Sequence, residues 1–222
     1  MTAFKKIKTN WRTATSDKVF LYCLIVGLMI SAAIVFTLPF FYQYLEARNG
    51  IVLKDILLGS IEPANVSLPI FILIWGMVLL GVVRSLYTPR IFLNYMTAFI
   101  LVTIMRTICL SLIPLNPPLG IVELKDPFTD VFYGGTFITK DLFFSGHVAT
   151  LVLLTLSFER KWDKIFTAIA AVIVAFLLLV QHVHYSIDVI AAPFFAWTGF
   201  KAGQKLLSFI RYKFQVSLLP AQ

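Results

Sequence analysis

Acidic side chains and cysteines are both scarce in this sequence. Only 11 of 222 residues are Asp or Glu and two are Cys, whereas 59% are hydrophobic and the mean hydropathy is +0.87. Cys23 and Cys109 fall in different apolar runs, toward opposite faces of the predicted bundle, so we expect no disulfide between them. A soluble domain of this length could not bury so much apolar surface, and the composition therefore places the chain in a lipid bilayer.

Internal repeats, low-complexity stretches and glycine-rich nucleotide loops are also missing. The pair Gly134-Gly135 lacks the spacing of a phosphate-binding loop and is more typical of a turn. A net charge of +8 could suit nucleic acid, but the charges are distributed as membrane orientation requires. We therefore expect no nucleic-acid partner.

Long apolar runs occupy most of the chain. A membrane-spanning helix needs about 20 mostly apolar residues. The windows that qualify are 19–42, 66–86, 92–113, 142–158, 165–181 and 185–202. They predict an all-α integral membrane bundle of six transmembrane helices over 19–202, preceded by a basic segment 1–18 and followed by a basic tail 203–222. The first run is longer than a cleaved signal peptide allows and is interpreted as a retained anchor.

The basic residues divide unevenly between the two predicted faces. Most of the 19 Lys and Arg residues fall in the N-terminal segment, the 84–90 and 159–164 loops and the tail. The positive-inside rule then puts both termini in the cytoplasm. The long connections 43–65 and 114–140 lie on the outer side, and the prolines and glycines of the second predict a fixed, irregular loop.

Ionisable residues in three of the predicted helices fall at one depth near the outer boundary. They are Arg106, His147, His184 and Asp188. Because ionisable side chains are costly beside lipid, such residues point to a functional site. The alternative for His184 and Asp188 is a polar pair that only locks helix packing, and the shared depth of His147 and Arg106 argues against it.

The chemistry that these residues permit is phosphoryl transfer. His184 and Asp188 are four residues apart, so on a helix the carboxylate can hold one imidazole nitrogen and leave the other as a nucleophile. His147 can then act as general acid and base. Arg106 is a candidate phosphate ligand, with a structural ion pair to Asp126 or Asp130 as the alternative.

Four residues before or at the fourth predicted helix are further candidates for holding phosphate: Lys140, Asp141, Ser145 and Gly146. A helix start at Ser145-Gly146 offers free backbone donors and a positive dipole end. Asp141 either supports catalysis or caps the helix. No metal or other cofactor is required, although a zinc site of His147, His182, His184 and Asp188 is a weaker alternative because no tight ligand cluster or Cys pair supports it.

Two signatures resemble those of the type 2 phosphatidic acid phosphatase (PAP2) superfamily, and of its sphingomyelin synthase-like branch in particular. Ser145-Gly146-His147 follows an aspartate six residues before the histidine, and the second signature runs from His182 to Val189. Arg106 and the step Ile113-Pro114 also match that branch. The Lys-x6-Arg-Pro motif of the phosphatases is absent, and Leu178 stands where those enzymes carry Arg.

The resemblance implies a six-helix, PAP2-like enzyme that moves a phospho-head group from a glycerophospholipid to a lipid alcohol such as ceramide. In it His184, oriented by Asp188, takes the head group while His147 protonates the leaving diacylglycerol, and His147 then activates the acceptor. His182 and Tyr185 are expected to lie around the catalytic residues and support them without acting on the substrate.

A lipid phosphate phosphatase or phospholipase C-like hydrolase is the first alternative, since water can replace the alcohol in the same site. A lipid transporter or scaffold without turnover is the second. The expected partners are the membrane, a phospholipid donor and a lipid alcohol acceptor, and a homo-oligomer is left open. The active site is expected to face the outer side of the membrane.

Overall fold

The computed structural model describes residues 2–124 and 138–217, and those residues are helical with irregular connections. The elements are α1 (Ala3–Ser16), α2 (Lys18–Ala47), the short 3-10 helix η1 (Leu58–Ser60), α3 (Ser67–Tyr87), α4 (Pro89–Leu112), α6 (Gly146–Ser157), α7 (Lys161–Val180) and α8 (Ser186–Ser217). The all-α class predicted from composition is confirmed for this part of the chain.

Four of these helices are long and apolar enough to cross a membrane: α2, α3, α4 and α7. Large apolar side chains in mid-helix remain exposed, among them Phe36, Ile72 and Val172 at 74%, 62% and 71%. Side chains of this kind would be costly in water and are suited to contact with lipid. The chain is therefore an integral membrane protein.

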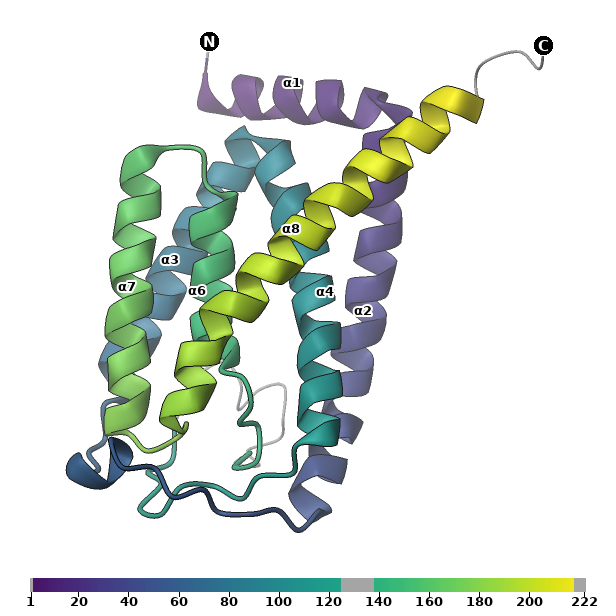
Figure 1. The fold of residues 1–222 in the computed structure, drawn as a ribbon. Helices are drawn as coiled ribbons and strands as arrows, with labels where there is room; N and C mark the ends of the chain where they lie inside the picture. Colours follow the sequence, from purple (N-terminus) through teal and green to yellow (C-terminus); the bar gives the residue numbers. More distant parts are fainter. Residues whose placement is uncertain (1, 125–137, 218–222) are drawn as a thin grey trace.

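The segment expected as a basic N-terminal extension is a helix that lies across one end of the bundle (Figure 1). The indole of Trp11 donates to the carbonyl of Leu86 at 3.1 Å, and Asn10 donates to the carbonyl of Tyr87 at 2.7 Å. Asp17 then begins α2, since its carboxylate accepts the amides of Val19 and Phe20. These bonds fix α1 to the end of α3.

The helix α8 runs diagonally over the bundle and continues to Ser217, through most of the segment expected as a tail (Figure 1). It packs on α4 and α6. At Gly199 a Cβ atom would lie 2.4 Å from Cγ2 of Val102, so this close crossing of α8 and α4 needs glycine. The crossing directs the first turn of α8 toward the start of α6.

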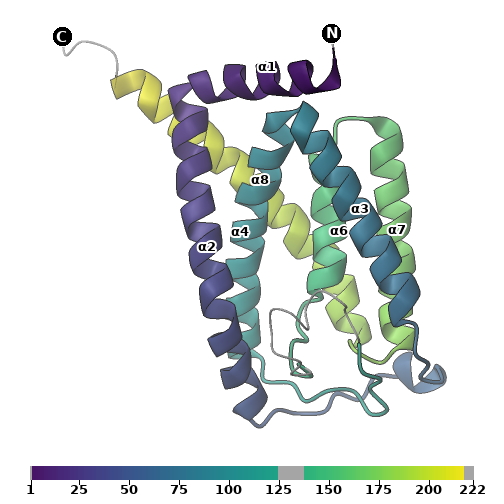
Figure 2. The same cartoon turned by 180° about the vertical axis from the view of Figure 1, so that it is seen from behind.

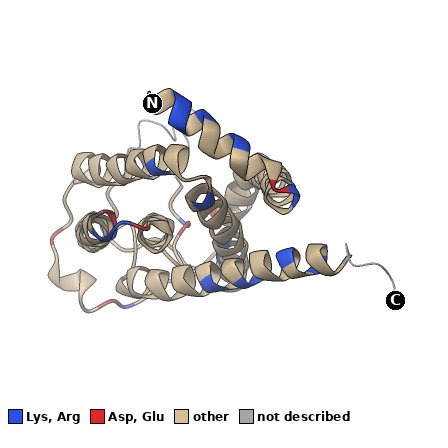
Figure 3. Ribbon diagram, turned by 90° about the horizontal axis from the view of Figure 1, so that it is seen from above, with Lys and Arg blue, Asp and Glu red and all other residues tan. Residues whose placement is uncertain are grey.

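The two ends of the bundle differ. The helix α1 and the last turns of α8 share one end, and the loops 48–66, 113–124 and 138–145 cover the other (Figure 2). Seen from the α1 end, Lys and Arg residues lie on α1 and along the second half of α8 (Figure 3). The candidate catalytic residues lie at the opposite, loop-covered end.

Candidate active site

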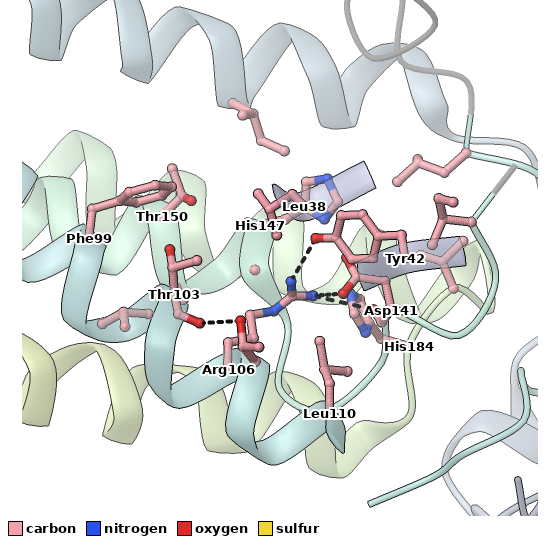
Figure 4. Close-up of a pocket in the computed structure, with 18 of the residues that line it drawn as sticks. Leu38, Tyr42, Phe99, Thr103, Arg106, Leu110, Asp141, His147, Thr150 and His184 are labelled. Carbon is pink, nitrogen blue, oxygen red and sulfur yellow. Dashed lines mark hydrogen bonds and ion pairs between the residues drawn. The ribbon is translucent and has the colours of Figure 1, made fainter. Parts of the chain in front are cut away.

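A cavity of about 480 Å³ opens at the loop end of the bundle, between α2, α3, α4 and α6. Its wall is mostly apolar, with side chains such as Leu38, Phe99 and Leu110 (Figure 4). Arg106, Asp141, His147 and His184 are among the few ionisable groups that line it. A pocket with apolar walls and a few convergent polar groups is a suitable binding site for a lipid head group and the first part of its chains.

His184 and Asp188 form the predicted pair, although His184 is not helical. It lies in the turn before α8, two residues ahead of Ser186. Its Nδ1 is 3.4 Å from Oδ2 of Asp188, and the same oxygen accepts the amide of Tyr185 at 2.9 Å. Both side chains are buried. The bond to Asp188 occupies Nδ1 and leaves Nε2 of His184 for chemistry.

His147 is the second residue of α6 and meets His184 across the cavity. The two ring centroids are 6.4 Å apart at an interplanar angle of 68°, and the His147 ring also contacts Phe71. One phosphoryl group placed between the rings can touch both. The structure thus brings together the two histidines that the sequence placed on separate elements.

Arg106 reaches from α4 into the same region, and its guanidinium is already well bound. Nη2 lies 2.7 Å from Oδ1 of Asp141, Nε donates to the carbonyl of Phe144 at 2.8 Å, and Nη1 donates to Tyr42 Oη at 3.4 Å. The ion-pair partners considered from the sequence, Asp126 and Asp130, lie outside the described residues. The carboxylate that Arg106 does meet is that of Asp141.

Asp141 does not cap α6, so that alternative is wrong. The N-cap position is Ser145, and no side chain caps the helix there. The chain from Asp141 to Ser145 is irregular, because α6 begins at Gly146 rather than at residue 142 as expected. A Cβ atom on Gly146 would lie 3.1 Å from Cζ of Arg106, so the missing side chain is what lets the guanidinium rest on the helix start.

Lys140 and Ser145 do not take the positions expected of phosphate ligands. The ammonium of Lys140 donates to the carbonyls of Glu46 and Arg48 at the end of α2, and Lys140 is absent from the cavity lining. Ser145 is fully buried, and its amide donates to the carbonyl of Asp188 at 3.0 Å. Lys140 therefore anchors α2, and Ser145 ties α6 to α8 through its backbone amide, while its buried hydroxyl has no hydrogen-bond partner among the described residues.

His182 and Tyr185 hold the surrounding loops. The two ring nitrogens of His182 lie 2.9 Å from the carbonyls of Leu119 and Ile61, which leaves neither nitrogen for the zinc site considered as an alternative. Among the described residues no three His, Cys, Asp or Glu side chains gather as a metal site. Tyr185 donates its hydroxyl to the carbonyl of Asn116 at 2.9 Å.

Two contributors were missed from the sequence. Tyr42 reaches the Arg106 guanidinium from the last turns of α2, and Glu46 accepts the amides of Thr139 and Lys140 at 2.6 and 2.7 Å. A polar side chain at the end of an otherwise apolar run was the available signal. The contacts themselves could not be predicted, because Tyr42 is 64 residues from Arg106 and Glu46 is 93 residues from Thr139 in the sequence.

One comparison with known proteins covers the part of the chain that contains the two histidines. Residues 140–204 match the family model described as PAP2 superfamily C-terminal, a stretch that contains both histidines and Asp188. No curated protein matches the chain. The match supports membership of the PAP2 superfamily, whose members are generally lipid phosphatases or related phosphotransferases.

Proposed function

We propose that this protein transfers a phospho-head group from a glycerophospholipid to a lipid alcohol, as sphingomyelin synthase-like enzymes do, through a phospho-histidine on His184. The observation that carries the proposal is the meeting of His147 and His184, 6.4 Å apart between ring centroids, on a cavity with largely apolar walls. Two imidazoles, one of them backed by a carboxylate, supply a nucleophile and a separate acid–base group.

In the first half-reaction Nε2 of His184 attacks the phosphorus of the donor lipid. The bond from phosphorus to the diacylglycerol oxygen breaks, and His147 gives that oxygen its proton. Asp188 holds the proton on Nδ1 of His184 and stabilises the positive charge that develops on the ring. The products are diacylglycerol and a head group bound through phosphorus to His184.

In the second half-reaction the hydroxyl of the acceptor lipid loses its proton to His147 and attacks the same phosphorus. The nitrogen–phosphorus bond breaks and His184 regains its lone pair. His147 then carries the proton needed for the next cycle. The choice between lipid alcohol and water is made by the walls of the cavity, and their apolar character favours the lipid.

Arg106 acts mainly as a fixed positive charge. Arginine has five N–H donors, and among the described contacts four of them face Asp141, Phe144 and Tyr42. One donor on Nη1 is left to meet a phosphate oxygen. The charge is therefore held in place by the protein and needs little reorganisation when phosphate arrives.

In the membrane we place six helices across the bilayer, the four long apolar ones together with α6 and α8, with both termini in the cytoplasm. The basic residues of α1 and of the second half of α8 support this orientation by the positive-inside rule (Figure 3). The active site then opens toward the outer leaflet, where its donor and acceptor would enter from lipid.

Product analysis tests the proposal. Detergent-purified wild type and His184→Ala are incubated with fluorescent ceramide and a mixture of phosphatidylcholine, phosphatidylethanolamine and phosphatidylinositol, and products are separated by mass. We expect a new phosphosphingolipid and an equal amount of diacylglycerol from wild type only. Free phosphate or phospho-head group without a ceramide product would replace the proposal with a hydrolase, and lipid left unchanged would favour a transporter or scaffold.

A matched control excludes general damage. Thr167 is as buried as the site residues but lies in the first half of α7, where its hydroxyl bonds to the carbonyl of Asp163, and it does not line the cavity. Thr167→Val is expected to keep turnover within about twofold of wild type, because a change in packing away from the site acts mainly on stability.

A further inference from the structure

The first turn of α8 carries Asp188 and directly follows the turn that holds His184, but the residue before it provides no side-chain cap. The residue before the helix is Tyr185, whose hydroxyl points to Asn116 rather than to the first helical amides. Asp188 reaches back with Oδ2 to the amide of Tyr185, which is one half of a capping box. The other half, an oxygen for the helical amides, has to come from elsewhere.

Asp55 supplies that oxygen from a loop 131 residues earlier in the chain. Its Oδ2 accepts the amide of Ser186 at 2.6 Å, and its Oδ1 accepts the hydroxyl of Ser186 at 3.0 Å. Oδ1 also accepts the amides of Leu57 and Leu58 at 3.1 Å each, which fixes the carboxylate in its own loop. A carboxylate at a helix N-terminus further gains from the helix dipole.

We propose that Asp55 is a positioning residue for head-group transfer: by capping α8 from the 48–66 loop it holds the turn that aims His184 at the phosphorus. The inference rests on the proposed function for its catalytic consequence. Asp55 does not line the cavity, so it acts through Ser186 and the adjoining turn and not on the lipid.

The titration of Asp55 agrees with this role. Burial raises the pKa of its carboxyl, but the hydrogen bonds from Ser186, Leu58 and Leu57 together outweigh burial and lower it below the ordinary value of 3.8. The cap is therefore charged throughout the neutral range.

The loop has other anchors, which makes the inference testable without unfolding the protein. The amide of Leu53 donates to Tyr185 Oη at 3.2 Å, and the Asn116 side chain bonds to both the amide and the carbonyl of Gly50. Further along, the carbonyl of Ile61 meets His182. Loss of the Asp55 carboxylate should thus free the start of α8 while the loop stays in place.

Four variants separate the inference from a simple loss of stability. Asp55→Ala removes the cap, Asp55→Asn keeps an oxygen acceptor, and Ser186→Ala removes only the hydroxyl bond. Asp17→Ala is the matched control, because Asp17 caps α2 with two amide bonds far from the site. Each is assayed with fluorescent ceramide and the phospholipid mixture, and by hydrogen–deuterium exchange of peptides that cover 183–192.

For Asp55→Ala we expect kcat to fall by about 5- to 30-fold, the equivalent of a lost cap, with KM within twofold and faster exchange at the start of α8. Asp55→Asn should recover most of kcat, Ser186→Ala should lose less than Asp55→Ala, and Asp17→Ala should leave kcat and the exchange of 183–192 as in wild type.

Unchanged exchange at 183–192 in Asp55→Ala would overturn the inference, as would a rise in KM at constant kcat, which would mean direct contact with lipid. An equal loss in Asp17→Ala would overturn it too, by showing a general effect. The exchange measurement needs no turnover. It therefore tests the capping role of Asp55 even if the assays of wild type and His184→Ala show that the proposed transfer does not occur.

Discussion

Gly146 is the position at which a single methyl group tests whether Arg106 has to lie against the start of α6. In Gly146→Ala the new Cβ would lie 3.1 Å from Cζ, 3.3 Å from Nε and 3.4 Å from Nη1 of Arg106. Comfortable contacts between such atoms are about 3.5–4.0 Å. The guanidinium therefore has to shift by about half an ångström or less, while Asp141 and the carbonyl of Phe144 hold it from the other side.

The size of the effect follows from this shift. A misplacement of about 1 Å in a site can cost about 100-fold in rate, so a shift of about half that distance predicts a fall in kcat of about tenfold. Stability should not fall in parallel, because alanine is a better helix former than glycine by up to about 1 kcal/mol. The variant is thus expected to be slower and equally stable or slightly more stable.

The assay compares kcat for ceramide-dependent product formation and the melting temperature in detergent. The control is Gly76→Ala in α3, where a Cβ would meet nothing within 4 Å. Full activity in Gly146→Ala would refute the argued role of the Arg106 position. A loss of activity matched by a large fall in melting temperature would attribute the effect to misfolding instead.

Three further outcomes are expected. Lys140→Met should lower the melting temperature by weakening the end of α2 but keep kcat within about threefold, whereas a loss of about 100-fold would restore Lys140 as a phosphate ligand. Asp163→Asn breaks a partly buried ion pair with Arg84, 2.7 Å long, and should lower stability by about 1–3 kcal/mol without changing KM, as thermal melts and kinetics in parallel would reveal. The pKa of Asp55 is lower in the folded protein than its ordinary value of 3.8, so its carboxylate stabilises the fold at pH values above 3.8. This stabilisation is lost as the pH falls through the folded pKa. Protection of the first amides of α8, after correction for the pH dependence of intrinsic exchange, should therefore stay constant from pH 7 to 5 and fall only below about pH 4, a step that Asp55→Asn should lack.

Much of the helical core could be predicted from hydropathy alone. The apolar windows that begin at 19, 66 and 92 agree with α2, α3 and α4 to within a few residues, because their ends are marked by polar residues and proline. The start of α6 was placed four residues early. The run Leu142-Phe143-Phe144 is apolar but follows an irregular path, where the carbonyl of Phe144 serves Arg106 instead of a helix.

The contact between His184 and Asp188 was predictable because the spacing of the two residues is local. His184 and Asp188 meet as expected, even though the reason is a turn closed by the Asp188 carboxylate and not a continuous helix. The approach of His147 to His184 could be predicted only from the expectation that the two helices begin at the same depth in the membrane.

The supporting contacts could not be read from the sequence. Asp55 and Ser186 are separated by 131 residues, and Glu46 and Lys140 by 94. Nothing in the local pattern distinguishes a loop carboxylate that caps a distant helix from one that faces water. Such pairings depend on where each loop lies on the end of the bundle, and that position is set by the packing of the helices and not by the local sequence.

The central claim is a phosphorylated intermediate on His184, and it can be measured directly. Wild type, His184→Ala and His147→Ala are mixed with phosphatidylcholine, phosphatidylethanolamine and phosphatidylinositol in the absence of any lipid alcohol, quenched at alkaline pH and digested for peptide mass analysis. We expect an adduct with the phospho-head group of one of these lipids on the peptide that contains His184, present in wild type, absent in His184→Ala and strongly reduced in His147→Ala. Release of diacylglycerol with no adduct on that peptide, or an adduct on His147 instead, would contradict it.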